Sequence, residues 1–250
     1  MYMKGRDLLT LSDLTDAEMT ELIAFARELK SRFLAGEPME FLQGTHLFVH
    51  DPGGVLGSWD PFGLAVSQLG GRAHRLGAEE LRESWGETWM DRLQILDETG
   101  HGLAMASLGE SGGHGRLDEA ASQLRQPLLN MMSDLAAPFQ ALASFMTLQE
   151  RRGEKGSASR AALVWAPPGQ SLRPPSLPFS LSEILLRSGV ELRVACPAEF
   201  HPGLEFTELL AEAGGGEIVE DPGEALDGAD LVYALNWSLE GGEGLSEPAR

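Results

Sequence analysis

The most constraining feature of this sequence is a regular alternation of strand-like and helix-like segments. Short apolar segments predict strands at residues 45–50, 102–106, 161–165, 190–196, 217–219 and 230–235. Amphipathic segments between them predict helices. Strands separated by helical segments of about ten residues indicate βαβ units, in which neighbouring strands are parallel. We therefore predict an α/β fold with a parallel sheet in each half of the chain.

The first predicted helix has both a start signal and a periodic apolar stripe. Thr15 and Glu18 form a capping box, in which each side chain can accept a hydrogen bond from the backbone of the other residue. An apolar stripe at helical spacing follows, made by Met19, Leu22, Ile23, Ala26, Leu29 and Phe33. The segment Gly36-Glu37-Pro38 predicts the end of this helix.

Other helices are predicted from similar patterns. Phe62, Ala65, Val66 and Leu69 share one face of a helix that Gly70-Gly71 ends, and Pro138 is suited to the first position of a later helix. Further helices are expected at residues 116–124, 180–187, 204–213 and 224–226, with a proline-rich loop at residues 166–178.

One shift in composition predicts a domain boundary. The segment at residues 151–160, RRGEKGSASR, is charged, rich in Gly and Ser, and poor in apolar residues. We expect a first domain at residues 1–150, a linker at residues 151–160 and a second, incomplete domain at residues 161–250.

Composition excludes several classes of protein. The 250 residues include 38 acidic and 19 basic side chains, and the net charge of −19 argues against binding to nucleic acid. No apolar segment approaches the roughly 20 residues that a membrane-spanning helix needs, and the first residues lack the pattern of a signal peptide. A single cysteine, Cys196, excludes an intrachain disulfide and favours the cytoplasm. The six histidines show no metal-binding spacing, so neither a metal nor a cofactor is expected.

Several motifs resemble the aspartate/ornithine carbamoyltransferase family. They are FGLAVSQLGG at residues 62–71, the Pro-x-Gln segment at residues 138–140, and ADLVY at residues 229–233. Within the family the chain is most similar to the N-acetylornithine and N-succinylornithine branch, through NMMS at residues 130–133, Trp237 after Tyr233, and the proline-rich residues 172–178. The resemblance implies two parallel α/β domains of the carbamoyltransferase type, a first domain that resembles a carbamoyl-phosphate-binding domain, and a Rossmann-like second domain that resembles an amino-acid-binding domain. It also implies the backbone knot of that branch and assembly as a trimer.

The same resemblance implies that the substrate-binding motifs are degenerate. Residues 55–59 align with the family's Ser-x-Arg-Thr-Arg, so Gly57 and Trp59 replace arginines while Ser58 keeps a hydroxyl. The family's strand-end arginine aligns with Ala106 or Ser107, and its His-Pro-Cys-Gln with residues 137–140, which keep Gln140. Asn236 and Trp237 fall in the family's amino-acid-binding segment. Ser58, Trp59, Gln140, Asn236 and Trp237 are thus the candidate substrate-binding residues, and no catalytic residue is assigned. Family members continue beyond the position of Arg250, so the second domain is expected to be truncated.

Three functions remain open from the sequence. The preferred hypothesis is a family protein of arginine-pathway metabolism that lacks standard carbamoyl phosphate binding and acts as a degenerate subunit or regulator. It would form a homotrimer, or a hetero-oligomer with an active paralogue. A second is an active carbamoyltransferase on ornithine or an N-acylornithine, completed by a partner chain or by Arg72, Arg75, Arg82 or Arg116. A third is a non-catalytic module that binds an amino acid. The resemblance alone makes carbamoyl phosphate and an ornithine-like amino acid the candidate ligands.

Two further segments have a structural and a functional interpretation. The Gly-rich residues 109–116 form either a surface loop or a backbone cradle for an anion, with Arg116 as its counter-charge. Trp59, Trp85 and Trp89 either pack in the core or contact a ligand or partner.

Overall fold

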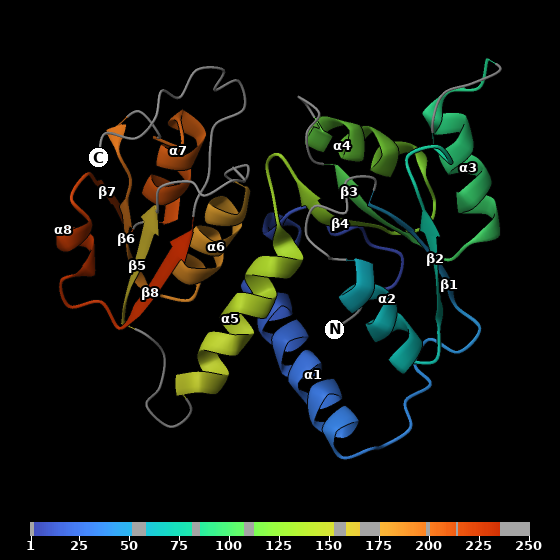
Figure 1. Ribbon diagram of the computed structural model, residues 1–250, viewed down its shortest axis with the longest axis horizontal. Coiled ribbons are helices and arrows are strands. Elements are labelled where there is room, and N and C mark those ends of the chain that lie inside the picture. The colour runs from blue at the N-terminus through green and yellow to red at the C-terminus, as the bar shows by residue number, and fades with distance from the viewer. Residues whose placement is uncertain are drawn as a thin grey trace. The chain divides into compact units, whose positions relative to one another are not determined.

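The chain divides into two compact units, residues 1–139 and residues 140–250 (Figure 1). The computed structural model describes residues 3–51, 59–81, 86–107, 113–152, 159–165, 176–198, 201–213 and 215–235. Each unit contains a four-stranded parallel sheet, as the alternating sequence pattern predicts. The predicted α/β fold class is confirmed. Assignment of residues 1–150, 151–160 and 161–250 as domains and linker stays a prediction.

The first unit has strand order β2-β1-β3-β4, and all its strand pairs are parallel. Its strands are β1 (His46–His50), β2 (Arg72–Leu76), β3 (Leu103–Ser107) and β4 (Leu128–Ser133). The helices are the 3₁₀ turn η1 (Leu11–Asp13), α1 (Asp16–Leu34), α2 (Trp59–Gln68), α3 (Trp89–Thr99) and α4 (Gly113–Gln123). Helix α5 (Pro138–Arg152) begins at the end of this unit and continues into the next.

Apolar side chains cover both faces of the first sheet, as a parallel sheet requires. On one face, Leu103 and Leu128 pack with Leu93 of α3 and Leu117 of α4, and none of the four is more than 2% exposed. On the other face a smaller cluster, Val49, Ala104, Ala106 and Met131, is covered by Phe62 of α2. The sheet is therefore a fixed support for the loops at its ends.

The second unit repeats this design with strand order β7-β6-β5-β8. Its strands are β5 (Arg160–Trp165), β6 (Glu191–Ala195), β7 (Gly216–Val219) and β8 (Leu231–Leu235), and its further helices are α6 (Ser176–Arg187), α7 (Leu204–Ala213) and α8 (Pro222–Leu226). Helix α6 is the most buried helix, and its Phe179 contacts Phe206 of α7 with ring centroids 4.8 Å apart. Ala225 of α8 packs on Ala162 and Ala195 of the sheet.

Most predicted elements are confirmed, with differences at a few places. Helix α1 begins at Asp16, with Thr15 as its N-cap and Glu18 completing the predicted capping box, and α7 spans the predicted residues. Helix α6 begins at Ser176, so the predicted loop to residue 178 is too long by three residues. Pro178 is the third residue of the helix, where a proline costs no helical hydrogen bond. No helix in the described part of the chain is long and apolar enough to cross a membrane.

Candidate functional site

The carboxyl ends of the strands in the first sheet define the candidate site. In an open parallel sheet, ligands bind outside these ends, at the point where the strand order reverses. Here the order reverses between β1 and β3. Strand β1 ends at His50, followed by the buried Asp51, while β3 ends at Ser107 and β4 at Ser133. Residues 52–58 lie outside the described residues, and they include all but the last of the residues 55–59 aligned with Ser-x-Arg-Thr-Arg.

Helix α4 begins directly against the end of β3. A Cβ atom on Gly113 would lie 2.5 Å from the backbone oxygen of Ser107 and 2.7 Å from its hydroxyl oxygen. Only glycine fits this approach without displacement of the backbone. Ala106, the residue before Ser107, is 4% exposed within the sheet cluster. The strand end that aligns with the family's arginine is therefore closely packed.

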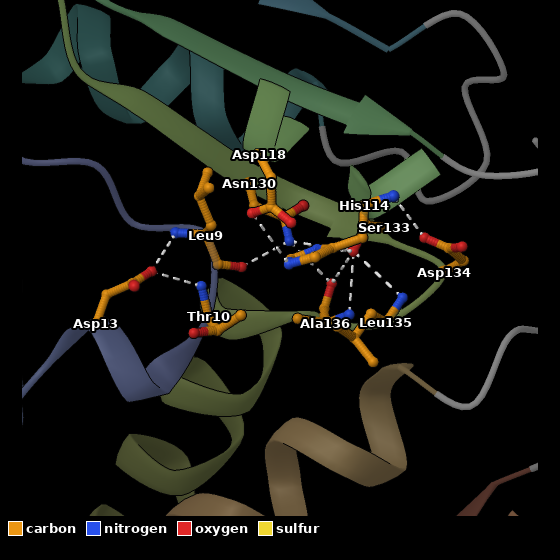
Figure 2. Close-up of polar contacts among 10 residues, drawn as sticks. All are labelled: Leu9, Thr10, Asp13, His114, Asp118, Asn130, Ser133, Asp134, Leu135 and Ala136. Atoms are coloured by element: carbon orange, nitrogen blue, oxygen red, sulfur yellow. Dashed lines mark hydrogen bonds and ion pairs between the residues drawn. The ribbon is translucent and has the colours of Figure 1, made fainter. Parts of the chain in front are cut away.

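A buried polar network holds the turn between β4 and α5 (Figure 2). The Asn130 side chain is fully buried, and its amide nitrogen donates to the backbone oxygens of Leu9 at 2.8 Å and Ala136 at 3.2 Å. The Ser133 hydroxyl oxygen accepts from the backbone N–H groups of Ala136 at 3.0 Å and Leu135 at 3.3 Å. These bonds satisfy groups that would otherwise be costly to bury, so they fix the path of the chain into α5.

His114 joins this turn to the start of α4. Its Nδ1 atom lies 2.9 Å from the Ser133 hydroxyl, and its backbone N–H donates to the carboxylate of Asp134 at 2.7 Å. Its Nε2 atom lies 3.8 Å from the carboxylate of Asp118, one helical turn later (Figure 2). The His114 side chain is 10% exposed. The starts of α4 and α5 are thereby linked at one edge of the sheet.

The succession of Ser133, His114 and Asp118 does not support nucleophilic catalysis. An activated serine must present its hydroxyl to a substrate. The Ser133 side chain is fully buried, and its oxygen already accepts two backbone hydrogen bonds. The arrangement instead positions the residues that follow it, residues 137–140.

The segment before α1 completes the network from the other side. The backbone N–H of Leu8 donates to Leu128 at 2.9 Å, and Asn130 donates back to Leu8 at 2.9 Å, as between paired strands. The Asp13 carboxylate accepts from the backbone N–H groups of Leu9 at 2.7 Å and Thr10 at 2.8 Å (Figure 2). The outer edge of β4 is therefore covered by the chain itself.

The predicted substrate-binding residues lie mostly outside the described part of the chain. Ser58, Asn236 and Trp237 lie outside the described residues. Trp59 is the first residue of α2, and only its backbone is described. Gln140 is exposed in the first turn of α5. These five assignments stay predictions.

Ala137, which the resemblance aligns with the family's histidine, is a buried residue. Ala137 is fully buried, and Pro138 begins α5 as the sequence predicts. Phe139 packs edge-to-face against Phe62 of α2, with ring centroids 6.4 Å apart. Ala137, Pro138 and Phe139 therefore bring apolar groups to this part of the edge.

Two arginines that were candidates to replace the family's phosphate-binding arginines lie in other environments. The Arg116 guanidinium carbon lies 4.5 Å from the ring centroid of Trp89, a cation–π contact. Through this contact Trp89 lies beside α4, and Trp89 is half-buried. Arg72 is the first residue of β2 and so lies at the amino end of the sheet, away from the candidate edge. Arg82 lies outside the described residues.

The amino end of the same sheet carries three histidines. The Nδ1 atom of His46 lies 2.9 Å from Nε2 of His74, and the backbone N–H of His46 donates to Nδ1 of His101 at 3.2 Å. Among the described residues, no group of three or more His, Cys, Asp or Glu side chains has a metal-binding arrangement.

The sequence did not predict that Asn130 and His114 belong to one buried hydrogen-bond network. The signal available was a pair of polar residues in and after an apolar segment, at Asn130 and Ser133. Polar side chains in a buried strand require partners, but Leu9, which accepts from Asn130, is 121 residues away from it. The sequence offers no indication of that pairing.

Comparison with known proteins is consistent with this geometry. A family profile described as "Aspartate/ornithine carbamoyltransferase, carbamoyl-P binding domain" matches residues 6–150. The ornithine carbamoyltransferase of Staphylothermus marinus is 32% identical over 251 residues, which cover 98% of this chain and 77% of that protein. The similarity thus extends through both units.

Solved structures agree with this similarity. The ornithine carbamoyltransferase from Pyrococcus furiosus has a TM-score of 0.80 and 26% identity, covering 98% of this chain and 76% of that one. An N-acetyl-L-ornithine transcarbamylase has the same TM-score at 20% identity, covering 93% of this chain and 76% of that one. At that identity the second match establishes the fold alone.

Proposed function

Because the chain belongs to the aspartate/ornithine carbamoyltransferase family, we propose that it serves arginine-pathway metabolism as a degenerate subunit or regulator. In this proposal it is cytoplasmic and lacks the family's standard carbamoyl phosphate site. The observation that carries the proposal is the apolar start of α5, where Ala137 is fully buried and Phe139 packs on Phe62. The resemblance places the family's histidine at Ala137.

A dianionic phosphate needs charged or backbone donors to replace its hydration. In the family, arginines of the Ser-x-Arg-Thr-Arg segment and of a strand end supply them, and here these positions are Gly57, Trp59 and Ala106 or Ser107. A charge-assisted hydrogen bond contributes about 1.5–3 kcal/mol. Loss of three would amount to roughly 5–9 kcal/mol, or about three to six orders of magnitude in affinity.

The surroundings of this edge offer little to restore the loss. A guanidinium at position 106 would have to enter the cluster of Val49 and Met131, and burial of an unpaired charge is costly. The Arg116 guanidinium is held over Trp89. The proposal therefore expects binding of carbamoyl phosphate to be weaker than millimolar.

A protein that keeps the family fold but has lost the ligand site is suited to the role of a subunit in an oligomer. We propose that the chain assembles as a homotrimer or joins an active paralogue in a hetero-oligomer, as the family resemblance suggests. Its buried β4–α5 network would keep the family shape, because its bonds join the protein's own backbone and side chains.

Calorimetric titration of the purified chain with carbamoyl phosphate tests the proposal, with and without ornithine and N-acetylornithine. An ornithine carbamoyltransferase titrated in the same buffer is the positive control. We expect no heat up to millimolar carbamoyl phosphate. Binding in the micromolar range would refute the proposal, whereas heat from an amino acid alone would favour a non-catalytic amino-acid-binding module.

One observation favours an active enzyme as the second candidate. Curated relatives that match 98% of this chain at 31–32% identity are ornithine carbamoyltransferases. Formation of citrulline from ornithine and carbamoyl phosphate would support this candidate. It would have to be lost in Arg75→Ala or Arg116→Ala if these side chains replace the family arginines.

A further inference from the structure

Three histidines from different segments of the first unit meet at the amino end of its sheet. His46 is the first residue of β1, His74 is in β2, and His101 is in the connection between α3 and β3. The ring centroids of His46 and His74 are 5.1 Å apart, and those of His46 and His101 are 6.1 Å apart. We call these three residues the histidine cluster. It lies at the opposite end of the strands from the candidate site, so it stands or falls independently of the proposed function.

The hydrogen bonds of His101 require one protonation state. Its backbone N–H donates to the backbone oxygen of His46 at 2.9 Å, and the backbone N–H of His46 donates to its Nδ1 atom at 3.2 Å. A ring nitrogen accepts a hydrogen bond only when it carries no proton. The His101 imidazole must therefore be neutral here, with its proton on Nε2. A protonated imidazole would turn an N–H toward the N–H of His46, and this bond would be lost.

The pair formed by His46 and His74 is limited in a similar way. The Nδ1 atom of His46 lies 2.9 Å from Nε2 of His74, and the two ring planes are 8° apart. One of these nitrogens must donate and the other must accept. The bond persists when one ring of the pair carries an extra proton, but two imidazolium rings have no acceptor between them. The cluster can therefore bind one extra proton without loss of a hydrogen bond, whereas its three rings could bind three.

Among the described residues, the charged groups on the neighbouring elements do not compensate for further protons on the cluster. Asp97 and Glu98, in the last turn of α3, both pair with Arg125. Arg72 is opposite His46 on β2, so its charge adds to that of an imidazolium. Strand β3, on the other side of β1, carries no charged side chain. The hydrogen bonds of the cluster therefore depend on its imidazoles remaining largely neutral.

We propose that the histidine cluster is a pH-sensitive contact, which holds the amino end of β1 to β2 and to the α3–β3 connection near neutral pH and releases them on acidification. A free imidazole binds its proton near about pH 6.5, so protons compete with these hydrogen bonds just below neutral pH. His46 and His74 are half-buried and His101 is exposed, so protons reach the cluster from solvent. Release would extend to the core, because Phe48 contacts the His74 ring, with centroids 5.5 Å apart, and packs on the core of the first unit.

Hydrogen exchange of the His46 backbone N–H in the full chain, followed by NMR from pH 7 to pH 5, measures this release. The open state binds two protons that the closed cluster excludes, so the equilibrium constant for opening should rise by up to about 100-fold per pH unit below about pH 6. The double variant His74→Gln, His101→Asn places amide groups near the positions of Nε2 and Nδ1, and these groups do not titrate. After correction for intrinsic exchange, its His46 N–H should stay equally protected at pH 7 and pH 5.

His201→Asn is the matched control, because Nδ1 of His201 also accepts from a backbone N–H, that of Gly203 at 3.1 Å, but in the other unit. It should leave the pH dependence at His46 unchanged. Equal protection of the wild-type His46 N–H at pH 7 and pH 5 would overturn the proposal.

The imidazole ¹⁵N shifts of wild type supply a second test, which needs no variant to fold. They should show His101 with its proton on Nε2 at pH 7, as the acceptor role of Nδ1 requires. A proton on Nδ1 of His101 at that pH would also overturn the proposal.

Discussion

Asn130→Asp tests whether the buried network determines the stability of the first unit. The substitution replaces an amide nitrogen, which donates to the Leu9 and Ala136 oxygens at 2.8 and 3.2 Å, by an oxygen that cannot donate when ionised. The Leu9 oxygen would lose this donor, whereas the Ala136 oxygen also accepts from the backbone N–H of Ser133 at 2.9 Å. One unsatisfied buried group costs about 1–3 kcal/mol. The carboxylate would also be buried without a cation, so we expect a total loss of about 4–6 kcal/mol at pH 7. That is a large part of the roughly 5–15 kcal/mol of a typical domain.

Urea unfolding, followed by tryptophan fluorescence and circular dichroism, measures this loss. Gln140→Glu is the matched control, because it makes the same change at an exposed position in the first turn of α5, where a negative charge is tolerated. Burial raises the pKa of the introduced carboxyl above its unfolded value, so the penalty should grow as pH rises from about 4. Below that pH the penalty should shrink without vanishing, because the protonated carboxyl donates one hydrogen bond where the amide donates two. Equal stability of Asn130→Asp and Gln140→Glu at pH 7 would refute the reasoning.

Three further predictions concern packing and ionisation. Gly113→Ala should cost about 1–3 kcal/mol in urea unfolding, because its Cβ would lie 2.5 Å from a backbone oxygen, whereas Gly115→Ala, with open space, should stabilise α4 by about 0.5–1 kcal/mol. The Arg6 guanidinium lowers the pKa of Glu18 to about 2. Wild type should therefore be more stable than Arg6→Met above pH 4.5, and this difference in stability should disappear as the pH falls to 2. Burial raises the pKa of the Cys196 thiol to about 11, so mass spectrometry should find it unmodified by iodoacetamide at pH 8 until the chain unfolds.

Local signals in the sequence were sufficient to predict the helices that contain them. The Thr15 capping box and the apolar period that follows predict α1, and both features depend on residues within a few positions of each other. Pro138 marks the start of α5 for the same reason, since its fixed φ suits the first turn. Elements of this kind can be read without knowledge of their tertiary partners.

The elements missed by the sequence are those whose identity depends on distant partners. Strand β2 contains Arg72 and Arg75 and lacks an apolar pattern, because it lies at the edge of the sheet. Strand β4 contains Asn130 and two methionines, which do not favour strands, and is held by pairing with β3 and Leu8. Helix α3 was missed although Thr88 and Asp91 form a capping box. That capping box is a local signal, so the start of α3 is predictable from residues 88–91.

The site was less predictable than the fold, because it combines ligand-binding positions with a buried hydrogen-bond network that supports them. The family's ligand-binding positions can be aligned by motif, which identifies Ala137 as a substitution but cannot reveal that its methyl group is fully buried. The support beneath that position consists of Asn130, Ser133 and His114, whose bonds connect backbone and side chains without a ligand. In the proposed function, loss of the phosphate-binding groups would therefore remove affinity while leaving the turn intact. Removal of several cations from one edge also relieves their mutual repulsion in the unliganded chain, so a binding site can be lost at little cost in folding stability.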